Sequence, residues 1–151
     1  MRTITLSFII FFSCLVGAGQ TPDEFKQRYG APDDKGHYFA RTGIVLSLIY
    51  SKDQKLSNII IEPGDLHITN SPDLERDSSA KAMPSDIAHQ VVDEIVPMEK
   101  RGKPESFSAV IESGCITIAP VDYEFVTIGF VKRCREQGGG TFKIDIKLKN
   151  K

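Results

Sequence analysis

The sequence predicts an α+β domain in two layers: an antiparallel sheet of about five strands, with two helices on one face, in the order α-β-β-α-β-β-β. Three observations predict this class. Two segments have the start signals and apolar spacing of amphipathic helices. Several runs alternate apolar and polar residues, which is typical of strands with one solvated face. The order of these segments favours helices packed on one side of the sheet.

Residues 1–18 are expected to form a cleavable signal peptide, and residues 19–151 a single domain. Arg2 supplies a positive charge, Ile4 to Val16 is apolar, and Val16-Gly17-Ala18 offers small residues to a signal peptidase. The apolar run is shorter than the roughly 20 residues of a membrane-spanning helix. A lipid anchor on Cys14 is the alternative, although Phe11 stands where a lipoprotein usually carries a Leu-like residue.

The charge balance argues against a general binder of nucleic acid or of anionic membranes. The formal charge of −1 becomes −2 when the leader takes Arg2 away. The C-terminal fifth is basic, as expected of a solvated strand face followed by a tail. Its cations are Lys132, Arg133, Arg135, Lys143, Lys147, Lys149 and Lys151.

The first half of the domain predicts a short helix and a β-hairpin. Thr21-Pro22-Asp23-Glu24 has the capping-box spacing of a helix start, and Phe25 and Tyr29 then share one face. Residues 43–51 and 56–61 read as the two strands of the hairpin. The stretch 65–83 is expected to be a mobile surface loop, or a functional one, because loops of this length are uncommon in compact domains.

The second half predicts a longer helix followed by strands. Ser85 is the expected cap, and Pro97 ends an apolar stripe made by Ile87, Ala88, Val91, Val92 and Ile95. A tight turn is expected around Pro120–Asp122. The strand-like runs are Phe107–Glu112, Cys115–Ala119, Tyr123–Lys132 and Thr141–Lys149. Ser113-Gly114 is either a bulge within one strand or a turn between the first two runs, and Gly138-Gly139-Gly140 turns the chain before the last run.

Two cysteines follow the leader, and in an oxidising compartment an even pair suggests a disulfide. Bonding of Cys115 to Cys134 would close a loop of about 20 residues, worth about 3 kcal/mol. A turn at Pro120–Asp122 would instead place Cys115 opposite a residue near 127. Two separate, half-buried thiols are therefore the alternative.

The three histidines give only weak candidates for a metal site. His89 and Asp93 lie four residues apart on the polar face of the second helix, which also fits an ordinary surface pair, because zinc requires three or four ligands. His37 lies in a Gly-flanked loop after Asp33-Asp34, and His67 lies in the 65–83 stretch. Their spacing does not bring them together, so no metal or cofactor is expected.

Catalytic motifs are equally weak. Ser113-Gly114-Cys115 is not the Gly-x-Ser-x-Gly elbow of a hydrolase. Gly138-Gly139-Gly140 lacks the Lys-Ser/Thr of a phosphate-binding loop and precedes a strand. No catalytic residue is predicted.

Four short motifs carry a resemblance: Tyr29-Gly30-Ala31-Pro32, Ile61-Glu62-Pro63, Arg101-Gly102-Lys103 and Asp122-Tyr123-Glu124. With them the chain resembles a group of small uncharacterised exported bacterial proteins, over most of the predicted domain. The helix, the Tyr-Gly-x-Pro segment and the hairpin are also similar to small outer-membrane assembly lipoproteins, but the lipobox is missing. The resemblance implies an exported domain and transfers no active-site residue.

The favoured hypothesis is a non-catalytic binding or protein-interaction module, secreted or periplasmic, whose partner is an extracytoplasmic protein or envelope component. The sheet edges and the 65–83 loop would offer the partner surface. The alternative is a small hydrolase or metal-dependent enzyme that uses His37, His67 or His89. An enzyme would bring two histidines, or a histidine and Cys115, into one cleft.

Overall fold

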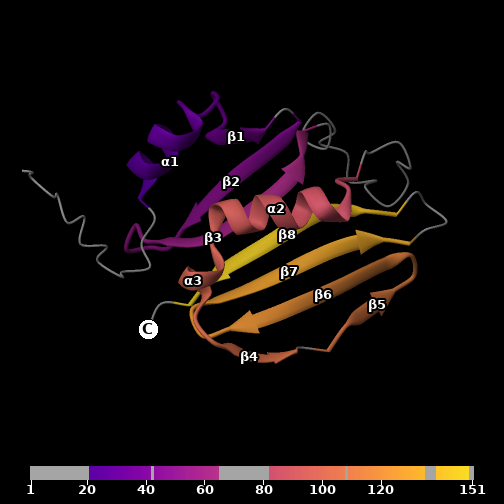
Figure 1. Ribbon diagram of the computed structural model, residues 1–151. Helices are drawn as coiled ribbons and strands as arrows, with labels where there is room; N and C mark the ends of the chain where they lie inside the picture. Colours follow the sequence, from indigo (N-terminus) through magenta and orange to yellow (C-terminus); the bar gives the residue numbers. More distant parts are fainter. Residues whose placement is uncertain (1–20, 42, 65–81, 108, 135–138, 150–151) are drawn as a thin grey trace, which may run out of the picture.

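The computed structural model describes residues 21–41, 43–64, 82–107, 109–134 and 139–149. The expected leader and nearly all of the 65–83 loop, with His67, lie outside the described residues. Figure 1 shows a twisted sheet with the helices in front of it. The α+β class and the antiparallel sheet are confirmed. The prediction of about five strands is wrong, because the described residues form eight.

The sheet runs in the order β1-β2-β3-β8-β7-β6-β4, with β5 also paired to β6, and every pairing is antiparallel. The chain therefore builds one half of the sheet with its first three strands and returns through α2 and α3 to build the other half (Figure 1). The strands are β1 (His37–Arg41), β2 (Ile44–Tyr50), β3 (Leu56–Pro63), β4 (Pro104–Phe107), β5 (Ile111–Ser113), β6 (Ile116–Tyr123), β7 (Val126–Arg133) and β8 (Thr141–Leu148).

The additional strands lie at the sheet edges. β1 begins at His37, which was expected in a loop, and only Tyr38 is buried in its mixed sequence. The expected strand Phe107–Glu112 is divided into β4 and β5, which pair with opposite ends of β6. Edge strands bury few side chains and so give only a weak periodic signal.

The predicted turn at Pro120–Asp122 is wrong. These residues lie inside β6, where Pro120 pairs with Gly129 and Asp122 with Thr127. The chain turns instead at Glu124-Phe125, between β6 and β7. Proline usually interrupts a strand because it has no N–H to donate. On the outer side of β6, one stretch of the strand pairs with β5 and another pairs with β4, and Pro120 lies between these two stretches.

The helices follow their local sequence signals closely. α1 (Pro22–Tyr29) has the predicted capping box: the Glu24 N–H donates to Thr21, and the Thr21 N–H donates to the Glu24 carboxylate. α2 (Ser85–Ile95) starts one residue earlier than expected, since Pro84 is the N-cap and Ser85 is its first residue. A short α3 (Met98–Arg101) occupies a charged segment between α2 and β4.

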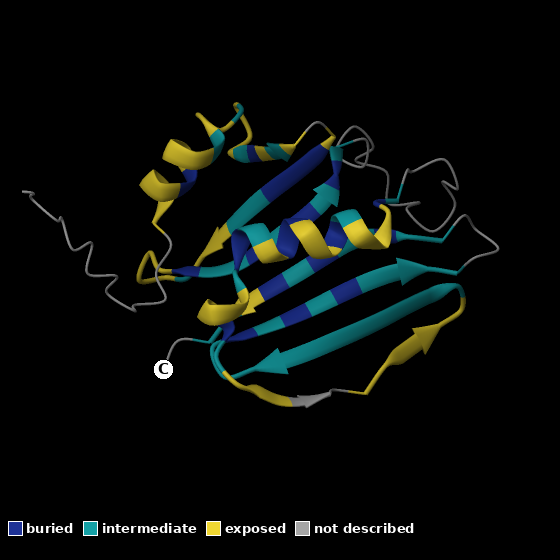
Figure 2. Ribbon diagram, viewed as in Figure 1, coloured by how far each residue is buried: buried dark blue, intermediate teal, exposed yellow. Residues whose placement is uncertain are grey.

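The core lies between the helices and one face of the sheet. α2 contributes its apolar stripe, and α1 contributes Phe25, which packs 5.9 Å from the ring of Tyr38. Figure 2 shows the buried positions on β2, β3, β8 and β7, whereas β6 is half-buried along its whole length. Within the described residues, no helix is both long enough and apolar enough to cross a membrane.

Candidate functional site

The structure places His37 on the edge strand β1 and His89 on helix α2, in separate parts of the molecule. His37 starts the edge strand β1, where its Nδ1 lies 3.2 Å from a carboxylate oxygen of Asp33. Asp33 also accepts hydrogen bonds from the N–H groups of His37 and Lys35, and these bonds, the one from His37 first, lower the pKa of its carboxyl. This arrangement is a side-chain-capped turn into β1.

His89 and Asp93 contact different neighbours and do not form a shared site. The His89 ring packs 4.6 Å from the ring of Phe130 on β7, whereas the Asp93 carboxylate binds the guanidinium of Arg101. His89 therefore lies over β7, whereas His37 lies on β1. Four strand spacings of about 4.8 Å, roughly 19 Å in all, separate these two strands, so the two histidines do not meet. Among the described residues no three His, Cys, Asp or Glu side chains gather as metal ligands.

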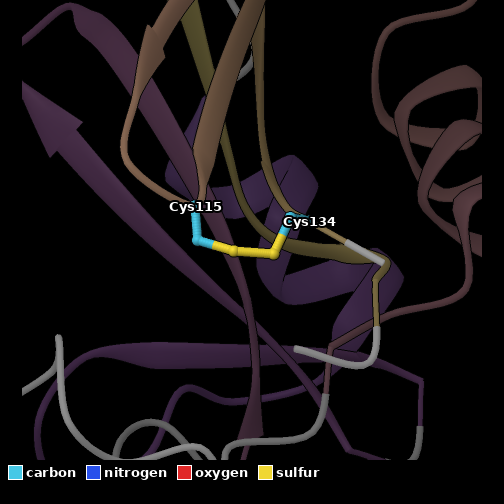
Figure 3. The surroundings of a disulfide bond; sticks show 2 residues. All are labelled: Cys115 and Cys134. Carbon is cyan, nitrogen blue, oxygen red and sulfur yellow. A yellow bond between two sulfur atoms is a disulfide. The ribbon is translucent and has the colours of Figure 1, made fainter. Parts of the chain in front are cut away.

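Cys115 and Cys134 are brought together, with Cα atoms 5.1 Å apart and sulfurs within disulfide distance (Figure 3). The position of the turn explains this pairing. Because β6 pairs with β7 from Asp122–Thr127 to Ile116–Arg133, the next residues outward are the two cysteines. The N–H of Cys134 donates to the carbonyl of Cys115 at 3.0 Å.

The Arg-Gly-Lys and Asp-Tyr-Glu motifs form one packed junction. The N–H of Phe125 donates to the carbonyl of Arg101 (3.0 Å), and the N–H of Glu124 donates to that of Lys103 (2.8 Å). Gly102 has a φ of +76°, and a Cβ there would lie 2.7 Å from the Cβ of Glu124. Only glycine fits this conformation and this contact.

Arg101 is the buried charge of this junction, at 5% exposure. Its Nε donates to the carbonyl of Val96 (2.8 Å), one terminal nitrogen binds Asp93, and the guanidinium carbon lies 5.7 Å from the Tyr123 ring centroid. These contacts tie the end of α2 to α3 and β6. The motif residues therefore have packing roles.

A second junction joins α1 and β1 to α2 through Glu94. The Tyr29 hydroxyl donates to Glu94 (3.3 Å), and the guanidinium groups of Arg41 (3.2 Å) and Arg28 (3.8 Å) lie beside the same carboxylate. Burial is the main cause that raises the pKa of Tyr29 to about 12. A shallow pocket of about 160 Å³ lies beside this junction, lined by Glu24, Phe25, Arg28, Tyr29, Ile95 and Lys100.

The described helices lie on one side of the sheet (Figure 1), and we call the other side the open face. Its positions follow from the strand register, since directly paired residues point to the same side. Only Val45 is buried among its described members. The others are His37, Phe39, Ser47, Ile49, Asn58, Ile60, Glu62, Ile111, Ser113, Ile116, Ile118, Pro120, Asp122, Thr127, Gly129, Val131, Arg133, Lys143, Asp145 and Lys147.

The two edges of the sheet differ. α1 lies along β1 and packs its Phe25 ring on Tyr38, so this edge is flanked by a helix (Figure 1). At the other edge β5 is exposed along its length (Figure 2), with Ile111 at 57% and the preceding Val110 at 56% exposure. An uncovered edge strand also directs the N–H and C=O groups of alternate residues outward. The β5 edge and the adjoining open face are the candidate functional site.

Comparisons with known proteins add little to this description. No family model and no curated protein matched the chain. A solved structure that is similar in part is a DUF4309 family protein, YjgB, from Bacillus subtilis subsp. subtilis str. 168. The similarity has a TM-score of 0.43 and 14% sequence identity, and it covers 85% of this chain and 78% of that chain.

Sequence reasoning named the sheet edges as a partner surface, but it missed the composition of the open face. Ile116 and Ile118 alternate with Thr117 and Ala119, a pattern that does not say which side the helices cover. Ile111 lay inside an expected strand, for which the sequence gave no indication of the buried side. The 57% exposure of Ile111 therefore became apparent only from the structure.

Proposed function

We propose that this chain is a non-catalytic, extracytoplasmic binding module that holds a protein partner on its open face. The observation that carries this proposal is the combination of an uncovered sheet face with two aliphatic side chains, Val110 and Ile111, more than half exposed at its edge. Contiguous exposed apolar surface on a soluble protein marks interaction sites. Burial of these side chains by a partner would supply the driving force for association.

Export supports the same proposal. The expected leader would deliver the domain to an oxidising compartment, where Cys115 and Cys134, already at disulfide distance, would be bonded. N-terminal sequencing of the exported protein tests this step. Cleavage after Ala18 is expected, so the sequence should start at Gly19. An acylated Cys14 would show instead that the chain is anchored by a lipid.

The partner surface is tested with two substitutions of the same residue type on the same face. Ile111→Asp charges the β5 edge, and Ile49→Asp charges an isoleucine of 43% exposure on β2. The tagged chain is cross-linked in intact cells, and the proteins retained by wild type and by both variants are compared. A protein retained by wild type and by Ile49→Asp, but lost with Ile111→Asp, supports the proposal. Equal retention by all three chains contradicts it.

A further inference from the structure

Two methionines lie among the described residues, and they differ in exposure. Met83 is 4% exposed and belongs to the core, whereas Met98, the first residue of α3, is 58% exposed. Hydroperoxides oxidise a methionine thioether to the sulfoxide where the oxidant can reach the sulfur. Of these two residues, Met98 is therefore the one that is open to such an oxidant.

The sulfur of Met98 lies against a buried cation. Nη1 of Arg101, a residue that is 5% exposed, donates to Met98 Sδ at 2.8 Å. The other two guanidinium nitrogens bind oxygen atoms: Nε donates to the carbonyl of Val96 (2.8 Å), and Nη2 binds the Asp93 carboxylate. A thioether sulfur is a weak hydrogen-bond acceptor. Nη1 is therefore the guanidinium nitrogen with the weakest acceptor.

We propose that Met98 is a reversible oxidation site whose sulfoxide oxygen is bound by the guanidinium of Arg101. The reactant is a hydroperoxide, in the simplest case hydrogen peroxide. This inference is independent of the proposed function, because Met98 and Arg101 lie in α3, whereas the proposed partner surface is the β5 edge with the open face.

The reaction transfers one oxygen atom and two electrons. A lone pair of the sulfur attacks one peroxide oxygen, and the S–O bond forms as the O–O bond breaks. The transferred oxygen loses its proton to the leaving hydroxide, which departs as water. Sulfur is oxidised and the peroxide is reduced. A methionine sulfoxide reductase that takes two electrons and two protons from a dithiol returns the thioether and a second water.

The product fits its surroundings better than the thioether does. An oxygen that carries partial negative charge is a stronger acceptor for a guanidinium than a neutral sulfur. More than half of Met98 is exposed, so the sulfur has room to move outward while the oxygen takes its place beside Nη1. Oxidation of Met83 would instead place a polar oxygen in the core, which costs stability.

A stronger bond to Nη1 would also strengthen a junction between elements. Arg101 already holds Val96 and Asp93 at the end of α2, and its backbone carbonyl accepts from the N–H of Phe125. A sulfoxide on Met98 would add a firm contact from the start of α3 to the same guanidinium. Oxidation is therefore expected to stabilise the folded chain.

Peptide mass spectrometry of the folded full chain tests the site. Hydrogen peroxide is added, and the gain of one oxygen is followed at each methionine. Met98 is expected to react about tenfold or more faster than Met83, as the ratio of their exposed fractions implies. In urea the two rates should converge. Equal rates in the folded chain would overturn the assignment of the site.

Thermal unfolding tests the role of Arg101 in holding the product. The chain is compared before and after treatment, at a stage where Met98 carries the oxygen and Met83 does not. The midpoint is expected to rise by about 3 °C and to return when a reductase removes the oxygen. A midpoint that stays the same or falls would overturn the proposal, because the oxygen would then gain nothing from the guanidinium.

Matched variants identify the methionine responsible. Met83→Leu conserves core volume and should keep the rise in the midpoint, whereas Met98→Leu should show no rise with peroxide. Met98→Gln offers an amide oxygen to Arg101, so its midpoint should lie above that of Met98→Leu without any oxidant. Circular dichroism verifies that all three variants fold. A rise that is lost with Met83→Leu and kept with Met98→Leu would show that the proposal names the wrong methionine.

Discussion

The two faces of the sheet differ in what covers them. Ile59, Ile61, Ile144 and Ile146 point toward the helices and are 0% exposed. On the other side of the same strands Ile60 remains partly exposed, next to Asp145 and Asn58. The helix-covered face supplies the stability of the domain, and the open face keeps apolar surface available. Substitutions on the two faces can therefore separate stability from the proposed binding.

The largest expected effect comes from two neighbouring isoleucines of β3 that point to opposite faces. Ile61→Ala removes a fully buried side chain and leaves a cavity, so we expect a loss of about 4 kcal/mol in the free energy of unfolding. Ile60→Ala, on the open face, should lose about 1 kcal/mol. Urea denaturation measures both. Similar losses for the two variants would remove the distinction between the faces.

The second prediction concerns the part of the sheet that the helices cover least. β6 is half-buried throughout, and the cysteine pair joins its end to β7. If the pair is bonded, Cys115→Ser should lower the free energy of unfolding by about 3 kcal/mol. Hydrogen exchange should accelerate in β6 and β7 more than in β2 and β3. Stability equal to wild type without reductant would show that the thiols are separate.

The third prediction compares two glycines with positive φ. Gly102→Ala places a Cβ against Glu124 and Phe125 in a conformation that costs an alanine energy, so we expect a loss of about 2 to 3 kcal/mol. Gly114, with a φ of +57°, has open space around it, and Gly114→Ala should lose only about 1 kcal/mol. Thermal unfolding of both variants measures the difference. A mild effect at Gly102 would mean that the α3–β6 junction adapts.

The class of the fold could be predicted from sequence because its signals are local. The capping box before Phe25 and the apolar stripe of α2 each lie within a few residues, and both appear as expected. The β6–β7 turn could not be predicted, since Pro120 resembles a turn residue when its strand partners are unknown. The cysteine pairing depended on that turn, so the sequence left it undecided.

The candidate site was harder to predict, for a different physical reason. Whether Ile118 or Ala119 faces the helices depends on which side α2 covers, and that is a long-range property. Arg101 is the opposite case, a charged residue whose burial could not be predicted from the sequence. Its sequence context is a charged connection, yet its side chain is buried against Val96 and Tyr123. The charged residues around Arg101 in the sequence do not indicate that its side chain is buried.

The smallest expected effect is a pH dependence at the Glu94 junction, on the helix-covered side. Burial raises the pKa of Tyr29 from 10.0 to about 12, and Arg28 and Glu94 act on it in opposite directions. The native state therefore keeps the phenol protonated at a pH where the unfolded chain has lost the proton. This contribution is fully present below pH 10 and is lost as the pH rises toward 12.

Tyr29→Phe should consequently lose less stability than wild type between pH 10 and pH 12, when both are unfolded in urea across that range. The difference between the two chains cancels the contribution of groups that both chains share, among them Tyr50, whose pKa burial also raises. Glu94→Gln is the matched variant, because it removes the carboxylate but leaves most of the burial of Tyr29. It should retain part of the wild-type pH dependence. Parallel curves for wild type and Tyr29→Phe would mean that α1 separates from α2 before Tyr29 titrates, and the Glu94 junction would then contribute little to the stability of the covered face.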